Sequence, residues 1–379
     1  MLMKRSFIRE ILEHTNSDAI SFAGGLPDSR LFPNLALKES ANIVLQNQAS
    51  LQYTHSTGEK ALKEKIAKQY TNDGFPTKSD EIMITSGSQQ ALDIITRYYQ
   101  GESITIESPS YLGAINLFRL NNLKMDSVRL GADGIDISQF KEKMTQTALC
   151  YLIPDFQNPT GLTYSHSRRV EVADVISKTN GLLIEDSPYS KLYFEEEMPS
   201  ISSYIPNNSF HLGSFSKSLA PALRIGWIRA NKKLLQPLIA YKEAMDLHTN
   251  GLAQQILNHY LEESRSYANH LELLRDSYEK KMHCFSMMLN KYLPTFSYVK
   301  PKGGMFIYGR FDEIDTSYLL KKCLAEGVLF VPGIEFYIDE KVNNEIRFNF
   351  TNASKDEVEQ GLMTIGDIIE NKLLCTKKH

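Results

Sequence analysis

One lysine in this sequence has neighbours that suit covalent chemistry. Lys217 lies in SFSKSLAPALRIGW (214–227), between two short apolar runs that are typical of buried strands. Lysine side chains usually stay in water, and one held between buried strands can act as a nucleophile toward an aldehyde. Ser214, Ser216 and Arg224 stand in the same segment. A plain surface loop would need none of these three neighbours.

Other polar residues also follow apolar runs. Asp186 ends GLLIED, where a carboxylate is costly to bury unless a positive group meets it. Asn158 follows ALCYLIP within QNPTG, Tyr111 follows SITIES, and Tyr189 lies shortly after Asp186. Each has a plain structural alternative: Asp186 as a solvated strand end or metal ligand, NPTG as a simple turn, and Tyr111 as core or rim packing.

A helix start follows the run EIMIT. In SGSQQALD (86–93), Gly87 permits a tight turn, and Ser88 and Gln89 begin a helical pattern whose free N–H groups suit a phosphate. The alternative is an ordinary helix cap. The sequence contains neither G-x-G-x-x-G nor a Walker loop, so nucleotide binding by those routes has no support.

These groups together match a single ligand. A lysine amine condenses with an aldehyde, and an aspartate pairs with a pyridinium nitrogen. An asparagine and a tyrosine bond a phenolic oxygen, while a serine-rich helix start and an arginine hold a phosphate. Those are the polar groups of pyridoxal phosphate, which a protein orients and tunes. We therefore predict pyridoxal phosphate as the cofactor.

The elements that must position these residues alternate along the chain. Helical patterns at 88–100 and 167–180 separate strand-like runs at 81–85, 103–108, 148–154, 181–186, 210–214 and 224–230. This order predicts an α/β fold whose mostly parallel sheet is covered by helices on both faces. A helical region at 251–293, strand-like segments and a final helix near 354–372 suggest a smaller α+β C-terminal domain. We expect an N-terminal arm over 1–40, a large domain over 41–260 and a small domain over 261–379.

Composition places few limits on function. The 379 residues are 42% hydrophobic and 23% charged, average for a soluble protein of about two domains. A net charge of -3 indicates neither a nucleic acid nor a membrane partner. No run approaches the ~20 apolar residues of a membrane span, and the charged N-terminus is no signal peptide. Four cysteines lack metal-type spacing and are expected to be free thiols in the cytoplasm: Cys150, Cys284, Cys323 and Cys375. We expect no metal.

The ordered motifs resemble those of fold-type I pyridoxal-phosphate aminotransferases. The similarity points to the subgroup that contains 2-aminoadipate and kynurenine aminotransferases and the effector domains of MocR-type regulators. It extends over nearly the whole chain, through SFAGGLPD (21–28), LQYTHSTG (51–58), SGSQQALD, SPSY, QNPTG, EDSPY, SFSKSLAPALRIGW and EIRFNF (345–350). The resemblance implies a seven-stranded, mostly parallel sheet and a smaller C-terminal domain.

The resemblance also implies a role for each matching residue. Lys217 would bond the cofactor, Asp186 would pair with its ring nitrogen, and Tyr111 would stack on the ring. The other implied cofactor contacts are Ser88, Gln89, Ser214, Ser216 and Arg224 at the phosphate, Asn158 and Tyr189 at the ring hydroxyl, and Tyr53 from the neighbouring subunit.

The implied substrate contacts come from both ends of the chain. Arg347 would clamp the α-carboxylate with its bidentate guanidinium, and Gly25, Asn158 and Tyr53 would line the same site. Arg9, in an expected N-terminal helix, would approach the substrate side chain. The alternative for Arg9 is a solvated pair with Glu13.

Two positions depart from the family pattern. His55 stands where many relatives have proline, and Ala222 where glycine is frequent. Both adjoin the expected site, so they put its geometry and substrate choice in doubt rather than the cofactor.

The implied activity is transamination by a cytoplasmic homodimer with a shared active site. An L-amino acid (2-aminoadipate, aromatic or branched-chain) would exchange its amino group with a 2-oxo acid such as 2-oxoglutarate, and Lys217 would move the α-proton. Two alternatives stay open: a pyridoxal-phosphate-binding sensor domain of a MocR-type regulator, and a pyridoxal-phosphate-dependent β-lyase.

Overall fold

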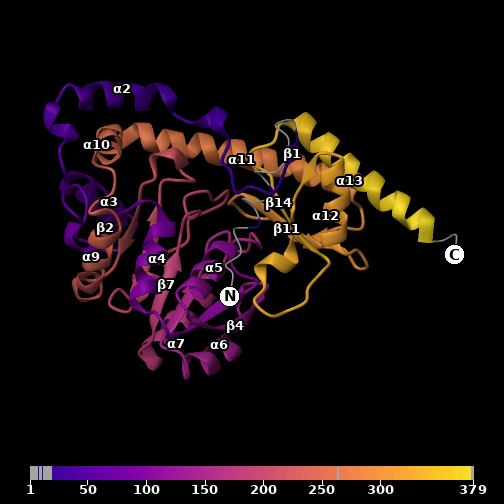
Figure 1. Cartoon of the computed structure of the whole chain (residues 1–379), viewed down its shortest axis with the longest axis horizontal. Helices are drawn as coiled ribbons and strands as arrows, with labels where there is room; N and C mark the ends of the chain where they lie inside the picture. The colour runs from indigo at the N-terminus through magenta and orange to yellow at the C-terminus, as the bar shows by residue number, and fades with distance from the viewer. Residues whose placement is uncertain (1–6, 8–10, 12–18, 263, 377–379) are drawn as a thin grey trace.

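The described residues form three sheets, of eight, four and two strands, with helices packed around them. The computed structural model describes residues 7, 11, 19–262 and 264–376, the side chains of 264–265 and 371–376 excepted. Figure 1 shows the larger sheet with its helices below the long helix α11 (Ser264–Tyr292), and the smaller sheet with β11 (Phe306–Arg310) and β14 (Glu345–Asn349) at the other end of that helix.

The larger sheet has the strand order β2-β9-β8-β7-β6-β3-β4-β5. Its strands are β2 (Ile82–Thr85), β3 (Ser103–Ser108), β4 (Lys124–Gly131), β5 (Gly134–Ile135), β6 (Leu149–Leu152), β7 (Leu182–Asp186), β8 (Ser209–Ser214) and β9 (Gly226–Arg229). The central pairs β4-β3-β6-β7-β8 are parallel, while β9 runs antiparallel to both of its neighbours.

The expected count of seven strands is one too low. The two-residue β5 pairs antiparallel with β4 and extends the edge of the sheet to eight strands. β4 has only one buried residue, Val128, and β5 is only two residues long. Neither strand therefore forms an apolar run of the kind that is typical of strands buried on both faces.

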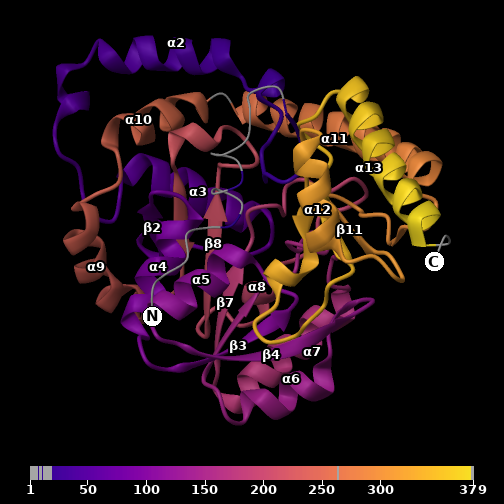
Figure 2. The same cartoon turned by 45° about the vertical axis from the view of Figure 1, so that its right-hand side comes forward.

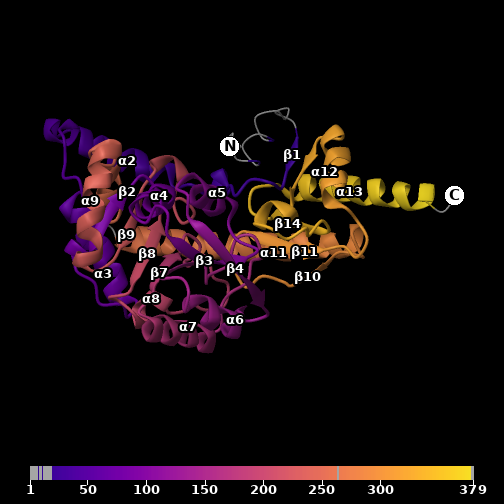
Figure 3. The same ribbon diagram turned by 60° about the horizontal axis from the view of Figure 1, so that its bottom comes forward.

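Helices cover both faces of this sheet, as the sequence predicts. Successive residues of β6 point to opposite faces, so Tyr151 packs in one core with Ile94 and Phe118, while Cys150 packs in another with Val172. Figure 3 shows α4 and α5 on one side of the strands and α6, α7 and α8 on the other. These helices are α4 (Ser88–Tyr98), α5 (Leu112–Leu120), α6 (Ile137–Met144), α7 (His166–Thr179) and α8 (Ile201–Tyr204).

Further helices complete the larger part of the molecule. Figure 2 shows α2 along one border and α9 and α10 beside α3 and β2. Their bounds are α2 (Asn34–Leu45), α3 (Lys60–Asn72), α9 (Lys232–Asp246) and α10 (Gly251–Tyr260). Short 3-10 helices are η1 (Ser29–Leu31), η2 (Gln48–Leu51), η3 (Ser79–Glu81), η4 (Pro221–Leu223) and η5 (Gly333–Phe336).

The smaller sheet is antiparallel and has the order β10-β11-β14-β13. It is formed by β10 (Ser297–Tyr298), β11, β14 and β13 (Val331–Pro332), with α11, α12 (Thr316–Ala325) and α13 (Lys355–Thr376) around it. An N-terminal strand, β1 (Ile20–Ser21), pairs in parallel with β12 (Val328–Leu329). The residues after β1 therefore lie between the two sheets.

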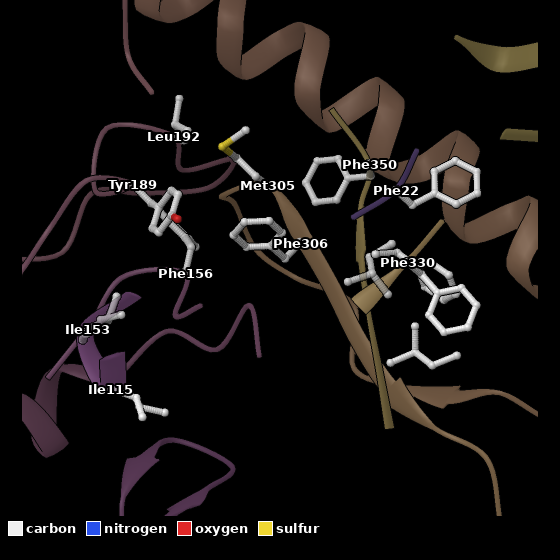
Figure 4. Close-up of a cluster of buried hydrophobic side chains, with 14 of the residues drawn as sticks. Phe22, Ile115, Ile153, Phe156, Tyr189, Leu192, Met305, Phe306, Phe330 and Phe350 are labelled. Carbon is white, nitrogen blue, oxygen red and sulfur yellow. The ribbon is translucent and has the colours of Figure 1, made fainter. Parts of the chain in front are cut away.

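The two parts meet where the strands of the larger sheet end. Figure 4 shows Phe156 and Tyr189 from the larger part facing Met305 and Phe306 near the start of β11. The rings of Tyr189 and Phe306 lie 5.8 Å apart, edge to face. Ligands of open α/β sheets bind beyond the carboxyl ends of the strands, which is this junction.

Candidate active site

Lys217 lies at this junction, after β8. Its Nζ donates to the main-chain oxygen of Gly25, 2.6 Å away. Phe215, buried in the core, and Ser218, whose hydroxyl accepts from Tyr267 of α11 at 2.9 Å, anchor the backbone on either side. The structure thus brings together two residues, Lys217 and Gly25, that lie 192 positions apart.

Asp186 ends β7 as a buried carboxylate. Its Oδ2 accepts from the hydroxyl of Tyr151 at 2.8 Å, whereas Oδ1 has no hydrogen-bond partner among the described residues. Burial raises the pKa of Asp186 to about 6, against the opposing effect of the Tyr151 hydrogen bond. A buried carboxylate oxygen without a donor favours a cationic N–H partner, and a pyridinium nitrogen is one.

A backbone cradle forms at the start of α4. Gly87, immediately before Ser88, has a φ of +83°, and a Cβ there would come within 2.7 Å of Arg224 Nη2. Arg224 is itself left-handed, with a φ of 54°, and its Nη2 donates to the main-chain oxygen of Ser86 at 3.0 Å. The free N–H groups of an eleven-residue helix and a guanidinium therefore face the same space.

Two serines complete this cradle. The Ser214 hydroxyl donates to Ser216 Oγ at 3.0 Å, and Arg224 Nη1 donates to the same oxygen at 3.4 Å. These groups are the donors that a phosphate needs. Gln89, the second residue of α4, also contacts the tyrosine predicted to stack on the ring: its Oε1 accepts from the hydroxyl of Tyr111 at 3.2 Å.

Asn158 connects the two sheets. Its Nδ2 donates to the hydroxyl of Tyr189 at 3.4 Å, and its Oδ1 accepts from Arg347 Nη1 at 2.8 Å. Both tyrosine and asparagine are buried. Burial raises the pKa of Tyr189, so its hydroxyl keeps its proton and can donate to a phenolic oxygen.

Arg347 is a buried cation on β14. Its Nη2 donates to the main-chain oxygen of Ala23, and its Cζ lies 4.3 Å from the ring centre of Phe306 and 5.1 Å from that of Phe336. Its Nε has no partner among the described residues, and burial lowers the pKa of its guanidinium to about 10. A desolvated guanidinium of this kind attracts a carboxylate strongly.

Tyr53 lies at the surface of the single chain. The side chain of Tyr53 is 78% exposed, and its ring contacts that of His248 at 5.6 Å. Arg9 lies outside the described residues. Of the two departures, His55 follows shortly after Tyr53, and Ala222 is exposed within η4, close to Arg224 in the chain.

Four residues that the sequence analysis did not single out belong to this region: Tyr151, Glu107, Phe306 and Phe336. Two of them had a signal in the sequence. A tyrosine in a buried strand needs a partner for its hydroxyl, and a glutamate inside the apolar run SITIES needs donors for its carboxylate. Phe306 and Phe336 gave no such signal in the sequence, because their contacts with Arg347 depend on how the smaller sheet folds.

The described residues contain neither a candidate metal site nor a candidate membrane span. Their His, Cys, Asp and Glu side chains form no group of three that could hold a metal ion. No helix in the described part of the chain is both long and apolar enough to span a membrane.

The fold and the site together define a class of protein. A lysine after β8, a buried carboxylate at the end of β7 and a phosphate cradle at α4 fit the aldehyde, ring nitrogen and phosphate of pyridoxal phosphate. On this α/β framework they define a pyridoxal-phosphate-dependent enzyme of fold type I.

Comparison with known proteins supports this class and identifies the family within it. Residues 17–365 match the aminotransferase class I and II family. The chain is 34% identical to an aromatic-amino-acid aminotransferase of Thermococcus litoralis, over 98% of this chain and 93% of that protein. It belongs to the aminotransferase class I and II family and is a pyridoxal-phosphate-dependent aminotransferase.

Two further relatives bear on function. The crystal structure of an α-aminoadipate aminotransferase of Thermus thermophilus, complexed with N-(5'-phosphopyridoxyl)-L-leucine, superposes with a TM-score of 0.91 at 31% identity, covering 98% of this chain and 96% of that one. An HTH-type transcriptional regulator of Bacillus subtilis, YdfD, is more distant, at 29% identity over 97% of this chain and 77% of its own length.

Proposed function

We propose that this aminotransferase moves an amino group between an L-amino acid (2-aminoadipate, aromatic or branched-chain) and a 2-oxo acid such as 2-oxoglutarate. The buried guanidinium of Arg347, 2.8 Å from Asn158 and against two aromatic rings, is the observation that supports it most directly. Both substrates of a transamination share an α-carboxylate, and the Arg347 guanidinium is a cation suited to hold it in each half-reaction. The aromatic and aminoadipate enzymes among the relatives support the range of substrates.

Each residue has a distinct task in this proposal. Pyridoxal phosphate, when bound, supplies an aldehyde and an electron-accepting ring. Arg224, Ser214, Ser216 and the N–H groups of α4 would hold its phosphate, and Asn158 and Tyr189 its ring hydroxyl. Asp186 would hold a proton on the ring nitrogen. Lys217 would bond the cofactor and, once displaced by the substrate amine, move the α-proton with its Nζ.

An assay of amino donors tests the substrate range. The purified, cofactor-loaded protein should convert 2-oxoglutarate to glutamate with 2-aminoadipate, aromatic or branched-chain donors. Borohydride reduction followed by peptide mapping should find a pyridoxyl group on Lys217. A pyridoxyl group on another lysine would remove that residue from its proposed task.

Arg9 is proposed to read the side chain of the substrate. Two residues near it in the sequence, Phe7 and Ile11, pack against an apolar cluster that includes Leu112 and Phe336. The ring of Phe336 in turn contacts Arg347. Arg9→Ala should lower kcat/KM for dicarboxylic substrates by roughly tenfold or more, since a charge-assisted bond contributes about 1.5–3 kcal/mol. It should leave leucine and phenylalanine nearly unchanged. Equal losses for both classes would count against this role.

The second candidate is a sensor domain of a transcription regulator, which the similarity to YdfD supports. A protein that binds pyridoxal phosphate and turns over none of the donors would favour it. Release of pyruvate and ammonia from a β-substituted amino acid would instead indicate a β-lyase.

We also propose a homodimer in which Tyr53 reaches the neighbouring site. Tyr53 and two leucines, Leu35 of α2 and Leu51 of η2, are 78%, 84% and 70% exposed in the single chain. Exposed apolar residues that cluster along such a segment favour a protein partner. A cytoplasmic location is supported by the free thiols of Cys150, Cys284 and Cys323. The two sheets support the division into 1–40, 41–260 and 261–379.

A further inference from the structure

The loop that contains Asn158 holds an unfavourable backbone conformation. It runs from residue 153, after β6, to residue 164, and Phe156 within it has a φ of 48°. A left-handed conformation is costly for an aromatic residue, so the surroundings must impose it. Gly304, in the smaller part of the molecule, accommodates the Phe156 side chain: a Cβ on that glycine would lie 2.5 Å from the Cβ of Phe156.

Glu107 holds this loop from β3. Its Oε1 accepts from the main-chain N–H of Ile153 at 3.1 Å and from the hydroxyl of Tyr164 at 2.8 Å, at the two ends of the loop. Its Oε2 accepts from Nε2 of Gln157 at 3.0 Å. The side chain is 1% exposed, and burial raises its pKa to about 8. None of these three partners is a cation, so this carboxylate is costly to bury and its donors must compensate.

Arg169 holds the same loop from α7. Its Nη2 donates to the oxygen of Pro154 at 2.9 Å and to Asp155 at 2.5 Å, and its Nε donates to the oxygen of Tyr164 at 3.1 Å. A buried carboxyl group and a buried guanidinium therefore bind the same loop. Glu107 accepts hydrogen bonds from the donors of the loop, and Arg169 donates hydrogen bonds to its acceptors.

Gln157 connects Glu107 to Asn158. It donates to Glu107 and to the oxygen of Pro109 at 2.9 Å, while its Oε1 accepts from the main-chain N–H and the hydroxyl of Thr160 at 3.0 and 2.8 Å. Its side chain has no freedom left to rotate. The next residue, Asn158, bonds Arg347 and Tyr189.

We propose that Glu107 is a positioning residue that sets the place of Asn158, and through it the orientation of Arg347, by fixing Gln157. It touches neither cofactor nor substrate. The inference rests on the proposed function, because Arg347 is taken there as the group that receives the substrate carboxylate.

Glu107→Gln tests the proposal with little change in shape. The new amide places a donor against the donor of Gln157, so Gln157 must turn and lose its bonds to Thr160. The KM values for the amino acid and the 2-oxo acid should both rise about tenfold or more, with a smaller change in kcat, because buried hydrogen bonds of Gln157 are lost and its polar atoms are left without partners. In the cofactor-free protein, amide hydrogen exchange within 153–164 should accelerate.

Exchanging the two residues should restore the arrangement. In Glu107→Gln with Gln157→Glu, residue 107 donates and residue 157 accepts, so every bond named above survives except that to Pro109. Both KM values and the exchange rates should return most of the way to wild type. Failure of the double variant to recover either quantity would overturn the proposal.

Glu185 provides the matched control. It is equally buried, lies on β7 of the same sheet and accepts from Ile201 and from the main chain and hydroxyl of Ser202, so it binds α8 rather than the loop. Glu185→Gln should lower Tm while leaving both KM values unchanged. If Glu107→Gln behaves in the same way, Glu107 is structural only. A wild-type protein without transaminase activity would refute the proposed function, and the hydrogen exchange would still test the loop.

Discussion

Individual residues of this site are charged and buried before any ligand is present. Asp186 has a carboxylate oxygen without a donor among the described residues, and Arg347 has an unpaired Nε. Burying a charge without full compensation costs free energy, which a bound partner of opposite charge restores. The two side chains thus favour a ligand that brings a cation to one and an anion to the other.

The free energy of unfolding of the cofactor-free protein should depend on pH because the Asp186 carboxyl group is buried. Its pKa is about 6 in the folded protein against an ordinary 3.8. Because the pKa is raised, the contribution of Asp186 to the free energy of unfolding is present below pH 4 and is lost as pH rises to about 6. Between pH 4 and pH 6, the free energy of unfolding of the wild type should fall by up to about 3 kcal/mol more than that of Asp186→Asn. Urea unfolding of both proteins at each pH measures the difference, and parallel curves would contradict it.

Removing the Arg347 guanidinium should affect every substrate alike. Arg347→Ala should lower kcat/KM by roughly 10–150-fold, as the loss of a charge-assisted bond of about 1.5–3 kcal/mol implies. Arg347→Lys should recover only part of this, because an ammonium cannot bond a carboxylate in the bidentate manner. Steady-state kinetics with several amino acids and 2-oxo acids provides the measurement. An effect on one substrate class alone would exclude a carboxylate clamp.

Among the elements, the turn between β2 and α4 sets the phosphate cradle. Gly87→Ala would place a Cβ 2.7 Å from Arg224 Nη2 and displace the guanidinium. The dissociation constant of pyridoxal phosphate should rise about tenfold or more, because a charge-assisted bond is weakened. Fluorescence titration of the cofactor-free protein measures it.

Gly74 offers a control with the same backbone cost. Its φ of +81° matches that of Gly87, but a Cβ there would meet nothing within 4 Å. Gly74→Ala should lower stability by about 1–2 kcal/mol, the cost of a left-handed alanine, and leave cofactor affinity unchanged. Similar losses of affinity in both variants would mean that strain, not the contact with Arg224, is responsible.

At the scale of the whole molecule, a single chain leaves the Tyr53 side chain 78% exposed. If Tyr53 acts in the neighbouring subunit, Tyr53→Ala and Lys217→Ala chains should complement each other after mixing and refolding. Each mixed dimer would then contain one intact site, so statistical pairing should restore about a quarter of wild-type activity. Activity no higher than that of the two separate variants would show that Tyr53 does not act across an interface.

Much of the site follows from the sequence because its residues are local to strand ends. Short apolar runs predict the buried strands of the larger sheet, and parallel strands place their carboxyl ends along one edge. Asp186, Asn158 and Lys217 each follow such a strand, so their proximity could be expected from the pattern. The phosphate cradle is equally local, because it depends on a glycine turn and the helix start after it.

Only the tertiary structure decided which distant groups meet. The contacts of Arg347 with Asn158 and of Lys217 with Gly25 span 189 and 192 positions, and no local periodicity specifies partners at that distance. The eighth strand was missed because a two-residue edge pair has no apolar run. Tyr151 and Glu107 are buried within strands, where a sequence shows that a polar group needs a partner but not which one. That choice depends on how the strands and loops pack, since burial rather than local preference determines which polar groups must pair.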